Sequence, residues 1–199
     1  MNPPLSDLAL DGLRELCSMG AGQAVGALSR LLGGEAVMLN VPRAVPLRRS
    51  ALAAELGPGA HVAVEFHVQG EAAGLLVLLM SEPSALQLAG ALLRRPSAET
   101  GPLEQDALSE VGNILASAFV DAWTRVTGLW LQPSVPRWLH GSAEEVVMGL
   151  RYADGEEPPA VLESTWAARA RPGVNGRLLV LPDGETVEPL LAALGLAGR

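Results

Sequence analysis

The chain has 199 residues, of which 49% are hydrophobic and 18% charged, and its formal net charge is −8 at pH 7. This composition is typical of a folded globular protein and excludes an intrinsically disordered chain. All 14 basic residues are arginine, so the Schiff-base and phosphate-loop chemistries that depend on lysine are excluded. An acidic balance without basic clusters argues against nucleic acid or an anionic membrane surface as a partner.

The single cysteine, Cys17, excludes an internal disulfide framework and fits a reducing compartment. The longest apolar runs, such as residues 74–80, are too short to span a bilayer, so membrane insertion is not expected. The chain begins without the charged and apolar segments of a secretory leader. These features predict a cytoplasmic protein. The acidic excess lies in residues 99–199. Two interpretations are open: a solvated surface, or a docking face for a basic patch on a partner.

The first half of the chain predicts a helix, three strands with a short helix after the first, and a second long helix. The first helix, residues 5–32, has apolar residues at helical spacing and is interrupted mainly by Gly20 and Gly22. The elements that follow are a strand at 36–45, a short helix at 50–56, strands at 61–68 and 73–80, and a helix at 83–93. Residues 94–102 connect the two halves.

The second half predicts the same six elements in the same order. Its first helix, residues 102–127, has Pro102 in its first turn and Gly128 as its C-terminal stop. The remaining elements are a strand at 129–137, a short helix at 142–150, strands at 161–169 and 176–182, and a helix at about 189–196. Short local matches support a duplication, for example Val41-Pro42-Arg43 against Val135-Pro136-Arg137.

The repeated order predicts an α+β fold. A pseudo-two-fold duplicated unit of helix, three strands and helix is expected to form one continuous antiparallel sheet flanked by long helices. Each half is too small to stand alone comfortably. We therefore predict a single domain over residues 1–199, with pseudo-repeats at about 5–95 and 102–196.

The helix at 102–127 has two different faces at about 100° per residue. Its core stripe is predicted to be Leu108, Val111, Leu115, Phe119, Ala122 and Val126. The opposite side presents an exposed polar row of Asp106, Glu110, Asn113 and Ser117. A solvated surface would explain such a row. The small residues Ala116, Ser117 and Val120 favour a face of low profile that another protein can approach.

The first helix carries a related row of Asp11, Glu15 and Ser18. Gly22 stands where the second helix has Ser117, and Ser18 stands where it has Asn113.

The pattern D-x3-E-x2-N-x22-P, formed by Asp106, Glu110, Asn113 and Pro136, resembles the signature of the CheC/CheX/FliY family of chemotaxis response-regulator phosphatases. The stretch EVGNI at 110–114 and the glycine-rich MGAGQAVGALSRLLG at 19–33 are also similar to CheC, and the resemblance covers about residues 5–196. It implies a hydrolase that removes the phosphoryl group from a phosphorylated CheY-like receiver protein. No additional flagellar-switch domain of the FliY kind is expected.

An aspartyl phosphate is already activated, and its hydrolysis requires a water aligned for in-line attack. A carboxamide can orient water and carries no charge that would repel the phosphoryl group. Under the resemblance, Asn113 positions this water and Glu110 binds the receiver's active-site lysine. Asp106 and Ser117 are docking residues, and Pro136 fixes the end of a strand. The chain is expected to need no cofactor or metal of its own, with Mg²⁺ held by the partner receiver domain.

The first row departs from the family pattern. Asp11 and Glu15 fit, but Ser18 replaces the asparagine, and Pro42 lies one residue further away than expected. A serine side chain is too short to place a hydrogen-bonding group at the same distance. We therefore interpret Asp11, Glu15 and Ser18 as a degenerate first site and the chain as single-sited.

The alternative function is a non-catalytic adaptor that binds a receiver domain or a CheD-type receptor deamidase. A purely structural relative in a larger assembly is a third class. The sequence leaves open whether the chain forms a homodimer and which response regulator it serves.

The other chemistry-bearing side chains are assigned to the scaffold. His61, His67 and Glu65 are interpreted as the solvated face of one strand, and Cys17 as a structural thiol. The four tryptophans are interpreted as core residues, of which Trp123 could border the docking face.

Overall fold

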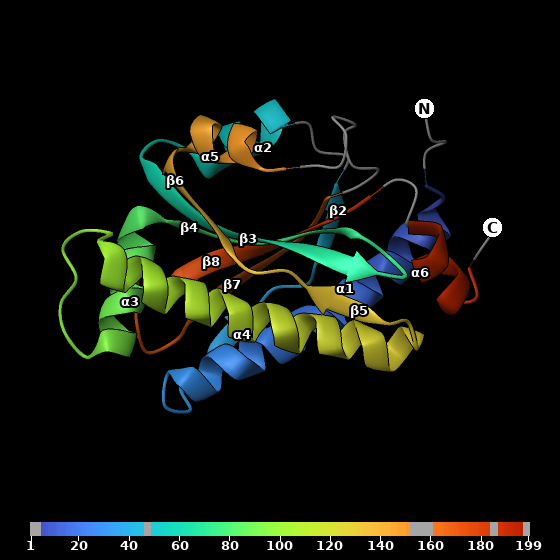
Figure 1. The fold of residues 1–199 in the computed structure, drawn as a ribbon, viewed down its shortest axis with the longest axis horizontal. Coiled ribbons are helices and arrows are strands. Elements are labelled where there is room, and N and C mark those ends of the chain that lie inside the picture. Colours follow the sequence, from blue (N-terminus) through green and yellow to red (C-terminus); the bar gives the residue numbers. More distant parts are fainter. Residues whose placement is uncertain (1–4, 46–48, 152–160, 184–186, 197–199) are drawn as a thin grey trace.

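The computed structural model describes residues 5–45, 49–151, 161–183 and 187–196. The helices are α1 (Asp7–Leu31), α2 (Arg49–Leu56), α3 (Glu82–Leu93), α4 (Pro102–Thr127), α5 (Ala143–Gly149) and α6 (Val187–Ala193). The strands are β1 (Val37–Leu39), β2 (Arg43–Val45), β3 (Ala60–Gly70), β4 (Gly74–Ser81), β5 (Leu131–Pro133), β6 (Arg137–Ser142), β7 (Val161–Ala168) and β8 (Asn175–Pro182). The sheet lies between α1 and α4 on one side and α2 and α5 on the other, with α3 and α6 at opposite ends (Figure 1).

The strands in the described residues form one eight-stranded antiparallel sheet, as predicted for this α+β chain. Strands β4 and β8 pair at its centre. The first strands of each half exchange: β1 and β2 pair with β7, whereas β5 and β6 pair with β3. This exchange joins the two sequence halves through hydrogen bonds at both sides of the sheet.

The single strands predicted at 36–45 and 129–137 are each two short strands. The second piece begins directly after Pro42 in one half and directly after Pro136 in the other. A proline cannot donate a hydrogen bond to a strand ladder, so the ladder is interrupted there.

Helices α1 and α4 pack against each other and have matching buried faces. Each of the ten buried residues of α1 has a buried counterpart in α4 that lies 95 positions later, such as Leu13 and Leu108. Duplication of one ancestral helix would explain this correspondence. The assignment of a single domain to residues 1–199 stays a prediction. At the same spacing, Ser18 occupies the place of Asn113.

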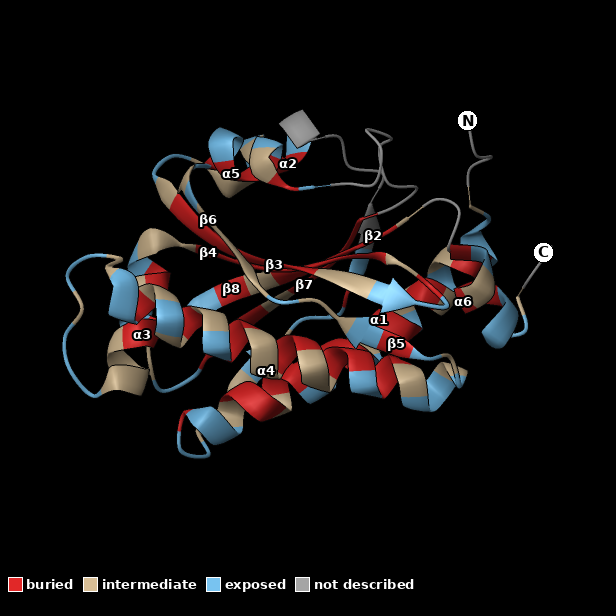
Figure 2. Cartoon of the chain, viewed as in Figure 1, coloured by how far each residue is buried: buried red, intermediate tan, exposed pale blue. Residues whose placement is uncertain are grey.

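The second face of the sheet is also covered, which corrects the interpretation of His61 and Glu65. Their exposed fractions are 3% and 0%, whereas solvated positions were predicted. A second apolar cluster, which includes Leu52 of α2 and Val146 of α5, covers this face. Strand β4, at the centre of the sheet, is buried along most of its length (Figure 2). The opposite face of β3, which carries Val62, Val64 and Phe66, faces the main core as predicted.

The buried carboxylates on this face are held by arginines in an arrangement that recurs in both halves. The Arg137 guanidinium donates to both oxygens of Glu65, at 2.9 and 2.8 Å. The second pair joins Arg43 of the first half to Glu163 of the second half, and Glu163 also accepts from Arg177 at 2.6 Å. In both halves the arginine lies opposite the glutamate in the strand register. The repeated Pro-Arg motif thus neutralises one buried carboxylate per half.

Replacing Arg137 with methionine is expected to lower the free energy of unfolding by about 3 kcal/mol, because the fully buried Glu65 carboxylate would lose its cation. Urea unfolding measures this loss. The matched control is Arg125→Met, an exposed arginine on α4, which should change stability by less than about 0.5 kcal/mol. Equal effects of the two substitutions would contradict a structural role for the pair.

Cys17 and Trp123 are core residues, as predicted. The Cys17 sulfur lies 3.8 Å from the Ser164 hydroxyl, and burial raises the pKa of the thiol to about 12. The Trp123 indole N–H donates to the carbonyl of Leu16 at 2.9 Å, so this side chain joins α4 to α1 and does not border an exposed face. Trp130 departs from the prediction, because it is 60% exposed in the connection between α4 and β5.

Candidate functional site

Helix α4, which carries the polar row, begins and ends as predicted. Pro102 occupies its first turn, and Gly128 ends it with a left-handed backbone, φ 73°. Near its start, Glu104 accepts hydrogen bonds from Arg95 at 2.6 Å and from Ser97 at 3.0 Å. Burial opposes ionisation of this carboxyl, but the hydrogen bonds outweigh burial and hold its pKa below the usual range. The connector is thereby fastened to the first turn of α4.

The four row residues lie along one side of α4, as the helical spacing predicted. Asp106 and Glu110 are exposed, and Asn113 and Ser117 are half-buried. Within the part of the chain that the structure describes, none of these four side chains forms a hydrogen bond or an ion pair. Glu110 and Asn113 are one turn apart and therefore neighbours on the helix surface. The row presents an anion and an amide that are free to bind an incoming molecule.

Two predictions about the flanks of the row are wrong. Ala116 and Val120 are buried, with exposed fractions of 1% and 2%, so they belong to the core and do not lower the profile of the exposed face. Val126, predicted in the core stripe, is 39% exposed near the end of the helix. Ser117, the third small residue predicted to lower the profile of this face, is half-buried.

The segment that joins β5 to β6 is bound to β3, and both strands pack on α4. The Ser134 backbone N–H donates to the His67 carbonyl at 2.8 Å, and the His67 N–H donates to the Ser134 hydroxyl at 3.0 Å. Val135 is 85% exposed, and Pro136 is half-buried immediately before β6. Pro136 therefore lies at a strand end, as the sequence predicted.

The corresponding row on α1 differs in chemistry from the row on α4. Asp11 and Glu15 are exposed and Ser18 is half-buried, so the positions match. However, the Asp11 carboxylate forms an ion pair with Arg14 at 2.7 Å, and α4 has a serine, Ser109, at the position of Arg14. The first row is thus partly neutralised and lacks the amide.

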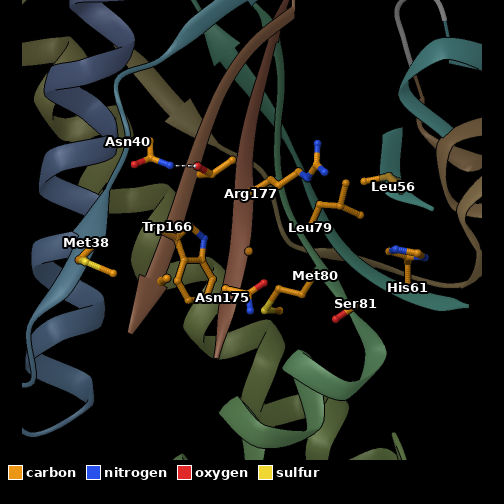
Figure 3. A pocket seen from close by; sticks show the side chains of 13 residues that line it. Met38, Asn40, Leu56, His61, Leu79, Met80, Ser81, Trp166, Asn175 and Arg177 are labelled. Carbon is orange, nitrogen blue, oxygen red and sulfur yellow. Dashed lines mark hydrogen bonds between the residues drawn. The ribbon is translucent and has the colours of Figure 1, made fainter. Parts of the chain in front are cut away.

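A separate hollow of about 420 Å³ was not predicted from the sequence. Its lining comes from the β1 end, α2 and strands β3, β4, β7 and β8, and includes Asn40, His61, Ser81, Asn175 and Arg177 (Figure 3). None of the row residues lines it. Its polar groups are partly engaged: Asn40 donates to the Thr165 hydroxyl at 2.7 Å, and Arg177 is paired with Glu163.

In residues 5–45, 49–151, 161–183 and 187–196, no group of three or more His, Cys, Asp or Glu side chains could hold a metal ion. None of the helices described there is long and apolar enough to cross a membrane.

Comparison with known proteins places the row inside a recognised family segment. The model of the CheC-like family matches residues 103–140, which contain the row and Pro136. Over 198 residues the chain is 31% identical to the CheY-P phosphatase CheC of Bacillus subtilis, with 94% of this chain and 93% of that protein covered. The chain belongs to the CheC-like family. It is also 29% identical to a putative CheY-P phosphatase, CheC1, of Halobacterium salinarum over 140 residues, covering 69% and 71% of the two chains.

Solved structures of low sequence identity share this fold. FliY of Thermotoga maritima superposes with a TM-score of 0.75 at 16% identity, covering 96% of this chain and 98% of FliY. CheX of Borrelia burgdorferi, in a complex with CheY, BeF3 and magnesium, gives a TM-score of 0.59 at 16% identity, covering 83% of this chain and 96% of the matched chain. These likenesses confirm the FliY/CheX type of architecture that the sequence predicted.

Proposed function

We propose that this protein hydrolyses the aspartyl phosphate of a phosphorylated CheY-like response regulator. The observation that supports this most strongly is the unpaired row of Asp106, Glu110, Asn113 and Ser117 on α4, inside the segment that matches the family model. The end-to-end similarity to a CheY-P phosphatase supports the same reaction.

In the proposed reaction the Asn113 amide enters the receiver's phosphorylation site and orients a water opposite the aspartyl oxygen. The water oxygen bonds to phosphorus while the bond between phosphorus and the aspartyl oxygen breaks. Inorganic phosphate and a free aspartate result, and the water supplies the proton that is released. The amide accepts and donates hydrogen bonds without charge, so it does not repel the phosphoryl oxygens. Magnesium remains in the receiver's acidic pocket and compensates charge there.

The Glu110 carboxylate has a different role, because an anion beside phosphoryl oxygens would be repelled unless it met a cation. It binds the receiver's active-site lysine and anchors the complex. Asp106, one turn earlier, and Ser117, one turn after Asn113, extend the docking surface. The exposed position of Glu110 leaves it accessible for this pairing.

Phosphate release from a receiver loaded with acetyl phosphate tests the function. The protein should accelerate release at substoichiometric concentration, as a catalyst must. A stable complex with the receiver without faster release would favour the adaptor function. Binding to a CheD-type deamidase without phosphate release from the receiver would favour an adaptor that serves the deamidase.

Ser18→Asn is expected to create activity in the first row. When it is placed in an Asn113→Ala background, phosphate release should rise by about tenfold, because an amide then stands at the corresponding helix position. The comparison is made with Asn113→Ala alone. An unchanged rate would contradict the prediction and implicate the Arg14–Asp11 ion pair as a further defect of the first row.

A further inference from the structure

Gly112, directly before Asn113 in α4, lies at a point of close approach between the helix and β3. A Cβ atom at this position would lie 2.9 Å from a methyl carbon of Val64 and 3.2 Å from the ring of Phe66. Both neighbours are buried, with exposed fractions of 0% and 1%. Interiors are close-packed and do not yield easily, so any larger residue would lift this part of α4 from the sheet.

The corresponding contact between α1 and β7 in the other helix–strand pair has the opposite combination of side-chain sizes. Cys17 stands at the position of Gly112, and its sulfur lies 3.8 Å from Ser164 of β7. Ser164 follows the buried Glu163 just as Phe66 follows the buried Glu65. A small strand residue therefore meets a larger helix residue on α1, whereas a large ring meets glycine on α4. The two side chains that meet at this position, Cys17 with Ser164 or Gly112 with Phe66, set how closely each helix approaches the sheet.

Helix α4 is fastened on both sides of Gly112. Toward its start, Glu104 is bound to Arg95 and Ser97. Toward its end, the Trp123 indole is bound to the α1 backbone at 2.9 Å. A lift at Gly112 would therefore bow the helix between these two points and would not carry it outward as a rigid body. Ser134, in the segment that joins β5 to β6, stays bound to β3, so Asn113, the residue after Gly112, would move relative to this segment.

We infer that Gly112 is a positioning residue for the reaction, and this inference rests on the proposed function. It sets the depth of the Asn113 amide relative to the rest of the docking surface by letting α4 approach β3. A partner that docks on α4 and on the segment that joins β5 to β6 then meets the Asn113 amide at a fixed distance from that segment. Alignment of an attacking water depends strongly on such placement, since a shift of about 1 Å can reduce a rate by about 100-fold.

The test compares Gly112→Ala with the wild type at saturating phosphorylated receiver. Turnover should fall by about tenfold, for a displacement of roughly half an ångström, while the affinity for a beryllofluoride-loaded receiver stays within about twofold. The matched control is Gly26→Ala on α1, where the added Cβ would meet nothing closer than an Arg30 nitrogen at 3.8 Å. Turnover of this control should equal that of the wild type.

A second variant keeps the test decisive if Gly112→Ala alone folds poorly. Val64→Ala removes the nearest methyl group, so Val64→Ala/Gly112→Ala should turn over within about threefold of Val64→Ala alone. Turnover of Gly112→Ala equal to wild type, or a loss in the double variant as large as in the single one, would overturn the inference. So would a parallel loss of affinity and turnover. An inactive wild type would instead overturn the proposed function.

Discussion

Replacing Asn113 with alanine is expected to reduce phosphate release at saturating receiver by about 100-fold or more, because the proposed reaction assigns alignment of the attacking water to this amide. The affinity for the phosphorylated receiver should remain close to that of the wild type. Asn113 is half-buried on a helix surface and forms no hydrogen bond or ion pair with the described residues, so the melting temperature should change little. Single-turnover phosphate release, with binding measured separately, separates these quantities.

Two further variants at this position define the chemistry. Asn113→Asp keeps the size but adds a negative charge, so both binding and turnover should fall through repulsion of the phosphoryl group. Asn113→Gln keeps the amide but moves it by one methylene, and we expect a loss of turnover with little loss of affinity. Full activity in Asn113→Ala would show that the water is oriented by another group.

Replacing Glu110 with glutamine is expected to weaken receiver binding by about 30-fold or more. Loss of one partner from a charge pair that is desolvated in an interface costs about 2–5 kcal/mol, and each 1.4 kcal/mol is a tenfold change in affinity. The rate at saturating receiver should change much less, since the amide is retained. Affinity for a beryllofluoride-loaded receiver, measured at two salt concentrations, tests this role.

A double-mutant cycle identifies the partner of Glu110. In a receiver whose active-site lysine is replaced with methionine, Glu110→Gln should cause little additional loss of affinity. Independent, additive losses would contradict a direct pairing. Glu144→Gln on α5, an exposed acid away from the row, is the matched control and should leave the affinity unchanged.

The site helix could be predicted from the sequence because its signals are local. Pro102 and Gly128 mark its ends, and the apolar spacing between them separates the buried stripe from the polar row. The row of Asp106, Glu110 and Asn113 follows from the same spacing. The positions of Ala116 and Val120 were predicted wrongly because both are buried in the main core, and the spacing within one helix does not reveal how far its neighbours cover it.

The sheet could be predicted only in part. The alternation in β3 indicated one polar face, yet Glu65 is buried because Arg137, 72 positions away, neutralises it. The continuous apolar run of β4 was the signal that both faces of the sheet are covered. The exchange of the first strands between the halves could not be predicted, since two similar units offer the same hydrogen-bonding edges to themselves and to each other.

The structure of this protein bound to a beryllofluoride-loaded receiver would test the proposed site on α4. The receiver's phosphorylation site should lie over α4, with the Asn113 amide directed at the beryllofluoride group through a water and with Glu110 paired to the receiver lysine. A receiver seated on α1, or on the face formed by α2 and α5, with Asn113 left in solvent, would contradict it.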